Sequence, residues 1–319
     1  MTQYEKNAID PHIWDWPYII DHWNELIGPE NHDILLQSVQ LGIKSKYRAK
    51  VWALLTDCEK AKKEASFKYQ DLIEGDSQSH AIIDCDVPRT FNSFLSNPSP
   101  QLFKSLRRVL NAYAKIDTEI GYTQGMNFIV AMLLMYQDEE TAFWTFYSLM
   151  HLSFIPHRTF FVTNLPKIEI VRELTNKIVQ ERFPVLWQLL SQQKMDSTLF
   201  VPQWFMVAFL NAGFDFQLSS FIFDQFLAFG CAPLLSLGLA ILEIHKELFT
   251  HSIEEILQLL SNPGNSKKMT KQAINVAWAK HWITTKQFNE MMRTTVSKIR
   301  KDDNTIPDVQ NIIQKPNSS

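Results

Sequence analysis

The chain has 319 residues and a mass of 37.2 kDa, which is enough for one large domain or two packed lobes with a substantial core. A net charge of −3 and a pI of about 6.3 argue against nucleic-acid binding, which usually needs a basic excess. The three cysteines are widely spaced and form no Cys-x-x-Cys pair, which argues against a zinc or redox motif and indicates a reducing compartment. With 9 glycines, the chain has few residues for hairpin turns, so composition favours helices.

Apolar residues spaced three and four apart predict helices in the first half of the chain. One segment, 82–92, is an exception, because Pro88 favours an extended conformation at Val87 and predicts a stiff loop. The helices expected in this half cover 17–26, with Pro17 at or near its start, 33–41, 45–55, 59–73, 101–114, 126–136 and 138–152.

The second half shows the same periodicity, and no run of alternating residues indicates a strand. Polar residues and prolines predict a disordered tail over 301–319. The helices expected before this tail cover 165–179, 183–192, 199–210, 217–229, 234–250, 253–260, 271–280 and 285–300.

Three uncharged windows, 120–137, 197–214 and 225–242, approach the length of about 20 residues that spans a bilayer. Polar residues, glycine or proline interrupt each window, and acidic residues flank all three. The flanks lack the lysine and arginine bias of cytoplasmic loops. We therefore interpret the windows as helices buried in the protein.

The segment Ile83-x-x-Asp86-x-x-Arg89 places a carboxylate three residues before a guanidinium. The carboxylate can hold the arginine by charge-assisted hydrogen bonds, and the planar guanidinium suits phosphate oxygens. The simpler alternative is a surface ion pair of little consequence.

Tyr122-Thr123-Gln124-Gly125 lies between two predicted helices. The amide of Gln124 offers both a donor and an acceptor, which suits the positioning of a water molecule. The alternative is that this segment only begins a helix, with Thr123 or Asn127 as its cap.

Arg48 and Trp52 lie one helical turn apart, so the cation can contact the indole. The alternative is a core tryptophan that packs under the arginine stem. The chain contains no glycine-rich phosphate loop and no dinucleotide fingerprint, and hence no nucleotide-binding motif of its own.

The ordered set of these segments resembles the TBC domain family of Rab GTPase-activating proteins. The resemblance runs from about Gly42 to Phe249, and Lys44, Asn92 and Thr123 depart from the family's usual residues. The motifs that carry it are Gly42-Ile43, Arg48-x-x-x-Trp52, Ile83-x-x-Asp86-x-x-Arg89-Thr90-Phe91, Gly121-Tyr122-Thr123-Gln124-Gly125-Met126-Asn127, Gln203-Trp204-Phe205 and the run from Phe223 to Gly230.

This resemblance implies an all-α fold with two packed helical lobes that form a V. It implies an N-terminal lobe, 1–155, with an arginine-finger loop and a glutamine-finger loop, and a C-terminal lobe, 156–300. It also implies that Arg89 and Gln124 act as catalytic fingers, that Asp86 holds the Arg89 loop and that Tyr122 positions Gln124. Supporting or structural roles are expected for Ile83, Arg48, Trp52 and Trp204.

By the same resemblance, the partner is a GTP-bound Rab-type GTPase, and the chain is an activator rather than an enzyme in its own right. GTP and magnesium come from the GTPase, so the chain is expected to need no cofactor of its own. We expect a cytoplasmic protein in vesicle trafficking that reaches endomembranes through its partner, since the sequence shows no signal peptide or lipid anchor motif.

Two other functions remain open. The first is a catalytically silent Rab-binding scaffold in membrane traffic, against which intact Arg89 and Gln124 argue. The second is a conventional enzyme. Cys85 lies between Asp84 and Asp86, which disfavours a nucleophilic thiolate, and the nine histidines form no recognisable metal motif.

Overall fold

The computed structural model describes residues 12–28, 32–91, 98–152, 155, 157–250 and 252–302. All regular elements within this part of the chain are helices, so the predicted all-α class is confirmed. The α-helices are α1 (Trp16–Asp21), α2 (Trp23–Leu26), α3 (His32–Leu41), α4 (Arg48–Thr56), α5 (Cys58–Glu64), α6 (His80–Thr90), α7 (Pro100–Ile116), α8 (Met126–Leu134), α9 (Glu139–His151), α10 (Pro166–Arg182), α11 (Pro184–Gln192), α12 (Val201–Phe205), α13 (Phe216–Phe229), α14 (Ala232–Ile244), α15 (Ile253–Ser261), α16 (Lys271–Lys280) and α17 (Thr285–Asp302). Short 3₁₀ helices are η2 (Ser45–Tyr47), η3 (Tyr69–Asp71), η5 (His157–Phe160), η6 (Ser197–Leu199), η7 (Lys246–Thr250) and η8 (Pro263–Asn265).

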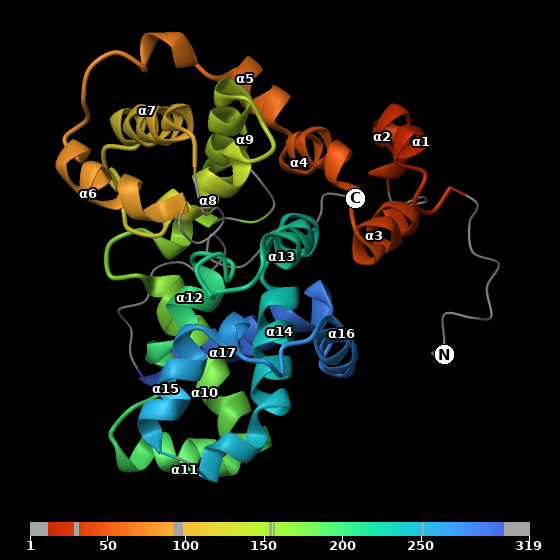
Figure 1. The fold of residues 1–319 in the computed structure, drawn as a ribbon, viewed down its shortest axis with the longest axis vertical. Helices are drawn as coiled ribbons and strands as arrows, with labels where there is room; N and C mark the ends of the chain where they lie inside the picture. Colours follow the sequence, from red (N-terminus) through yellow and green to blue (C-terminus); the bar gives the residue numbers. More distant parts are fainter. Residues whose placement is uncertain are drawn as a thin grey trace.

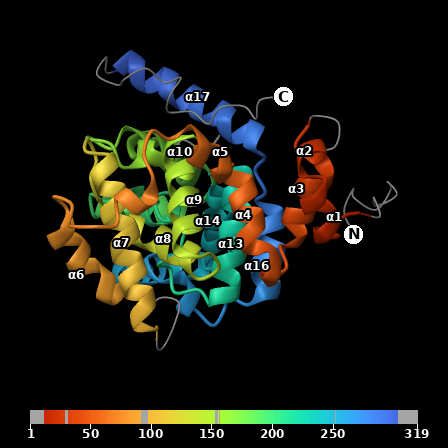
Figure 2. The ribbon, with the colours of Figure 1, turned by 90° about the horizontal axis from the view of Figure 1, so that it is seen from above.

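The helices form two groups that meet at α13 (Figure 1). Helices α4 to α9 make up one group, and α10 to α12 with α14 to α17 make up the other. Helix α13 packs against α14 and against α4 and α3, so it joins the two groups. Seen from above, α17 lies along one side of the molecule, where it packs against α10 (Figure 2). One continuous hydrophobic core extends through both groups, from Trp16 to Val296.

A buried ion pair connects the two groups. Arg48 on α4 donates from Nε and Nη2 to the carboxylate of Asp224 on α13, at 3.0–3.1 Å. The indole Nε1 of Trp52 donates to the same carboxylate at 2.8 Å. Burial raises the pKa of Asp224 to about 6, against the opposing effect of Arg48 and Trp52. The guanidinium of Arg48 lies over the ring of Tyr136, 5.5 Å from the ring centroid. Arg48 and Trp52 are linked to each other through the carboxylate of Asp224, which accepts hydrogen bonds from both.

Trp204 on α12 is buried against Gly238 in the middle of α14. A Cβ atom at position 238 would lie 2.1 Å from Cζ3 of the Trp204 ring. Glycine costs stability within a helix, but here it permits the close approach of the indole to the α14 backbone. Trp204 is therefore part of the core that holds α12 against α14.

The prediction of a loop over 82–92 was wrong, because helix α6 continues through Pro88 to Thr90. Proline removes the hydrogen bond to the carbonyl of Asp84, but both residues are exposed, so water can hydrate that carbonyl. Burial of Ile83, Val87 and Thr90 on the opposite face stabilises the helix. Arg89 therefore lies in the last turn of a helix, not in a loop.

Other boundaries also differ from the predictions. The single helix predicted over 59–73 is divided into α5 and η3, and the helix predicted over 199–210 is shorter, with α12 ending at Phe205. Lys301 and Asp302 belong to α17 rather than to a disordered tail, and the rest of that prediction lies outside the described residues. Among the described helices, none has the length and apolar character needed to cross a membrane.

Candidate functional site

The two candidate finger residues are exposed and come from neighbouring segments. Arg89 lies near the end of α6, and its side chain is 61% exposed. Gln124 is exposed in the segment that connects α7 to α8. Helix α6 packs against both α7 and α8, which brings the two segments together although they are far apart in sequence.

Asp86 is the residue that both segments share. Its Oδ1 accepts a hydrogen bond from Nη2 of Arg89, and its Oδ2 accepts one from the hydroxyl of Tyr122 at 2.5 Å. Asp86 is 2% exposed and Tyr122 is 5% exposed. Burial, and next the bond to Asp86, raise the pKa of Tyr122 well above its ordinary value, so the phenol remains protonated and donates at neutral pH. One carboxylate thus anchors the guanidinium of Arg89 and the backbone that carries Gln124.

A second bridge lies on the other side of the two fingers. The side-chain Nδ2 of Asn127 donates to Oγ1 of Thr90 at 2.8 Å. The Thr90 hydroxyl in turn donates to the carbonyl of Asp86 at 2.7 Å, and the N–H of Gly125 donates to Oδ1 of Asn127 at 2.9 Å. Thr90, which follows Arg89, is therefore hydrogen-bonded to Asn127, which in turn holds Gly125 next to Gln124.

The turn that carries Gln124 depends on two glycines in left-handed conformations. Gly121 has φ of +64°, and a Cβ there would lie 2.7 Å from Oγ of Ser79, which accepts a bond from the N–H of Tyr122 at 3.1 Å. Gly125 has φ of +111°, and a Cβ there would lie 2.9 Å from Cγ1 of Val207. Other residues would strain both positions, so the glycines fix the path of the turn.

The start of the same turn is clamped by Asp117 and Arg158. Arg158 in η5 donates from Nε and Nη2 to the two carboxylate oxygens of Asp117, at 2.7 and 2.8 Å. The hydroxyl of Tyr113 donates to Asp117 at 2.8 Å. Burial opposes ionisation, but the bonds from Arg158 and Tyr113 outweigh it and lower the pKa of Asp117. The charged clamp holds the backbone between α7 and Gln124.

The remaining predicted residues lie in the core. Ile83 is fully buried on the inner face of α6. Arg48 and Trp52 bond to Asp224, and Trp204 packs against Gly238. Asn92, one of the departures from the family pattern, lies outside the described residues. Ser79, Asp117 and Arg158 could not be identified from the sequence, because each acts through a partner that is distant in sequence. Asn127, considered as a helix cap, instead bridges to Thr90.

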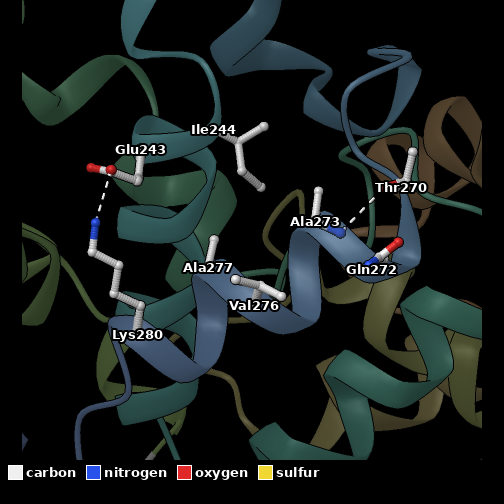
Figure 3. A pocket seen from close by; sticks show the side chains of 8 residues that line it. All are labelled: Glu243, Ile244, Thr270, Gln272, Ala273, Val276, Ala277 and Lys280. Atoms are coloured by element: carbon white, nitrogen blue, oxygen red, sulfur yellow. Dashed lines mark hydrogen bonds and ion pairs between the residues drawn. The ribbon is translucent and has the colours of Figure 1, made fainter.

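A shallow pocket between α14 and α16 is a separate feature (Figure 3). An ion pair between Glu243 and Lys280, at 2.9 Å, lies at one end, and the exposed Val276 lies near its centre. Helices α14 and α16 lie away from α6 (Figure 1). Within the described part of the chain, no group of three histidine, cysteine or acidic residues is placed to hold a metal ion.

Fold and site together define an all-α domain in which two hydrogen-bonded segments present an arginine and a glutamine on the surface. The model of the RabGAP-TBC family, described as the Rab-GTPase-TBC domain, matches residues 45–250 of this chain. The matched region covers more than half of the chain and contains Arg89, Gln124 and the segments that carry them. The chain therefore belongs to the Rab-GTPase-TBC domain family.

Curated relatives and solved structures agree with this assignment. The human Ecotropic viral integration site 5 protein homolog is 28% identical over 76% of this chain and 30% of its own length. The mouse TBC1 domain family member 2B is 30% identical over 69% of this chain and 23% of its own length. This chain therefore spans less than a third of each of these two relatives.

Two crystal structures have the same fold. The Ypt/Rab-GAP domain of Gyp1p superposes with a TM-score of 0.64 at 18% identity, covering 86% of this chain and 98% of that one. The Chlamydomonas flagellar RabGAP TBC domain superposes with a TM-score of 0.59 at 21% identity, covering 93% and 99%.

Proposed function

We propose that this chain is a GTPase-activating protein for a Rab-family small GTPase in its GTP-bound form. In this proposal Arg89 and Gln124 enter the partner's nucleotide site and supply what the GTPase alone lacks. The observation that carries the proposal is the carboxylate of Asp86, which bonds to both Arg89 and Tyr122. A surface ion pair of no consequence would not need a buried carboxylate tied to a second segment.

Arg89 has the chemistry that the reaction requires. Charge is spread over the phosphate oxygens as the γ-phosphoryl group is transferred, and an arginine supplied in trans accelerates hydrolysis by about 10³–10⁵. This factor corresponds to about 4–7 kcal/mol of transition-state stabilisation. The guanidinium has five N–H donors, and its bond to Asp86 leaves others available for phosphate oxygens.

We assign to Gln124 the role of orienting the water molecule that attacks the γ-phosphate. Its carboxamide can accept a hydrogen bond from the water and donate one to a phosphate oxygen. The glycines on either side of Tyr122-Thr123-Gln124, together with the bonds of Tyr122, preorganise the segment so that little entropy is lost when the partner binds.

Nucleotide and magnesium would come from the GTPase in this mechanism, and the chain would act as an activator without a substrate of its own. We also propose a cytoplasmic location, with recruitment to endomembranes through the partner. The class of the partner follows from the family to which the chain belongs.

The second candidate is a Rab-binding scaffold without activating power. Single-turnover GTP hydrolysis by a panel of Rab GTPases, each loaded with GTP and mixed with excess chain, separates the two functions. Acceleration of at least one GTPase by 10³-fold or more supports the activator. Binding to a GTPase without acceleration of any panel member supports the scaffold.

A further inference from the structure

The solvent-facing side of α6 carries apolar residues beside Arg89. We define the α6 apolar strip as Ala81, Ile82, Cys85 and Pro88, all of which are exposed. Ile82 is 56% exposed. Positions 82, 85 and 89 share one face of the helix, so the strip leads directly to Arg89. Among the large exposed hydrophobic residues of the described chain, Ile82 is the one on a finger-bearing helix.

The strip is kept free of a competing charge. Asp84 lies on the same helix, but its carboxylate accepts hydrogen bonds from Nε and Nη2 of Arg107 on α7, at 2.6 and 3.1 Å. Arg107 also pairs with Asp76. The ion pair holds the carboxylate of Asp84 towards α7, so the four residues of the strip, which carry no charge themselves, lead to Arg89.

Ile82 also borders the glutamine segment. Ser79 lies one turn before Ile82, and Asp86 lies one turn after it. Both bond to Tyr122, through its backbone N–H and its hydroxyl respectively. Tyr122, two residues before Gln124, therefore lies against the turn of α6 that contains Ile82.

We propose that the α6 apolar strip, with Ile82 at its centre, binds an apolar surface of the GTPase beside the nucleotide and helps to select the partner. This inference rests on the proposed function. Seven residues of helix place Ile82 about 10.5 Å from Arg89 along the axis. A standard interface buries about 800 Å² on each partner, a disc of about 16 Å radius. An interface centred on Arg89 therefore covers Ile82. An apolar side chain well inside an interface favours an apolar surface on the partner.

The test is a comparison of Ile82→Ala with the wild-type chain on the panel member that the wild type accelerates most. Alanine is the best helix former, so α6 should remain folded. We expect KM to rise about tenfold, because the side chain beyond Cβ no longer becomes buried on binding, while kcat changes less than twofold. The matched control is Val276→Ala, which truncates a 67% exposed aliphatic side chain on the distant α16 and should leave both constants unchanged.

Cys85 provides an independent readout, because it is exposed while Cys58 and Cys231 are buried. The GTPase loaded with a non-hydrolysable GTP analogue should slow maleimide modification of Cys85 at least fivefold. It should not slow modification of a Val276→Cys, Cys85→Ser variant. Unchanged KM for Ile82→Ala, or unprotected Cys85 in an active complex, would overturn this inference alone. Failure of the wild-type chain to accelerate any GTPase would overturn the proposed function as well.

Discussion

Tyr122→Phe removes a single hydroxyl and breaks the bond that ties the glutamine segment to Asp86. Both partners of this bond are buried, and the acceptor is a carboxylate, so the lost bond is worth about 1.5–3 kcal/mol. At about 2 °C per kcal/mol for a chain of this size, the melting temperature should fall by about 3–6 °C. In this variant Asp86 still bonds to Arg89 but no longer bonds to residue 122. The position of Gln124 relative to Arg89 should therefore be less well fixed. We expect kcat to fall about tenfold or more, since small misplacements of catalytic groups are costly.

The assay combines thermal unfolding with single-turnover GTP hydrolysis at a temperature well below both transitions. The control is Tyr18→Phe, which removes a hydroxyl from a half-buried tyrosine on α1, on the opposite side of the molecule from α6 (Figure 1). The control should retain wild-type turnover. If Tyr122→Phe matched the wild type in both melting temperature and kcat, the reasoning that Asp86 couples the two segments would be refuted.

Two further predictions concern stability. Arg48→Met should reduce the free energy of unfolding by about 3–5 kcal/mol, because it leaves the carboxylate of Asp224 buried without its cation. Urea titration measures this loss, and a decrease below 1 kcal/mol would show that the pair does not hold α4 to α13. The second prediction concerns pH. Because the pKa of Asp117 is lowered in the folded state, its stabilisation is present above the ordinary value of about 4 and is lost as the pH falls through the lowered pKa. The unfolding free energy of the wild type should therefore fall more between pH 6 and 3 than that of Arg158→Ala; equal slopes would contradict the clamp.

The helical periodicity of the sequence predicted most of the fold, because apolar residues at spacings of three and four determine which face of a helix is buried. Helix α7 is an example, because Leu106, Val109, Leu110 and Tyr113, which recur at spacings of three and four, are buried. Helix α6 cannot be predicted from local sequence, because Pro88 disfavours a helix locally and tertiary packing overrides this preference. The helix is stable at Pro88 because it buries Ile83 and Val87. The carbonyl of Asp84, which receives no hydrogen bond from Pro88, belongs to an exposed residue and can bond to water.

For the candidate site, the spacing of Asp86 and Arg89 allows the ion pair between them, because residues three apart on a helix can contact each other. The bond between Asp86 and Tyr122 links positions 36 residues apart, and that between Arg48 and Asp224 links positions 176 apart. Neither can be derived from local spacing. The same is true of Arg158, whose partner Asp117 lies on a different element.

The most direct test of the account is a double-mutant cycle on single-turnover GTP hydrolysis with Arg89→Ala, Gln124→Ala and the double variant. Both side chains are exposed, and Asp86 keeps its bond from Tyr122 when Arg89 is replaced, so both single variants should remain folded at the assay temperature. Binding to a GTPase with a non-hydrolysable GTP analogue should be largely retained. We expect Arg89→Ala to lose about 10³-fold or more in rate and Gln124→Ala to reduce the rate as well. The double variant should lose less than the product of the two effects, because the two side chains act as one unit in this mechanism. Wild-type turnover by either single variant would contradict the role assigned to that residue.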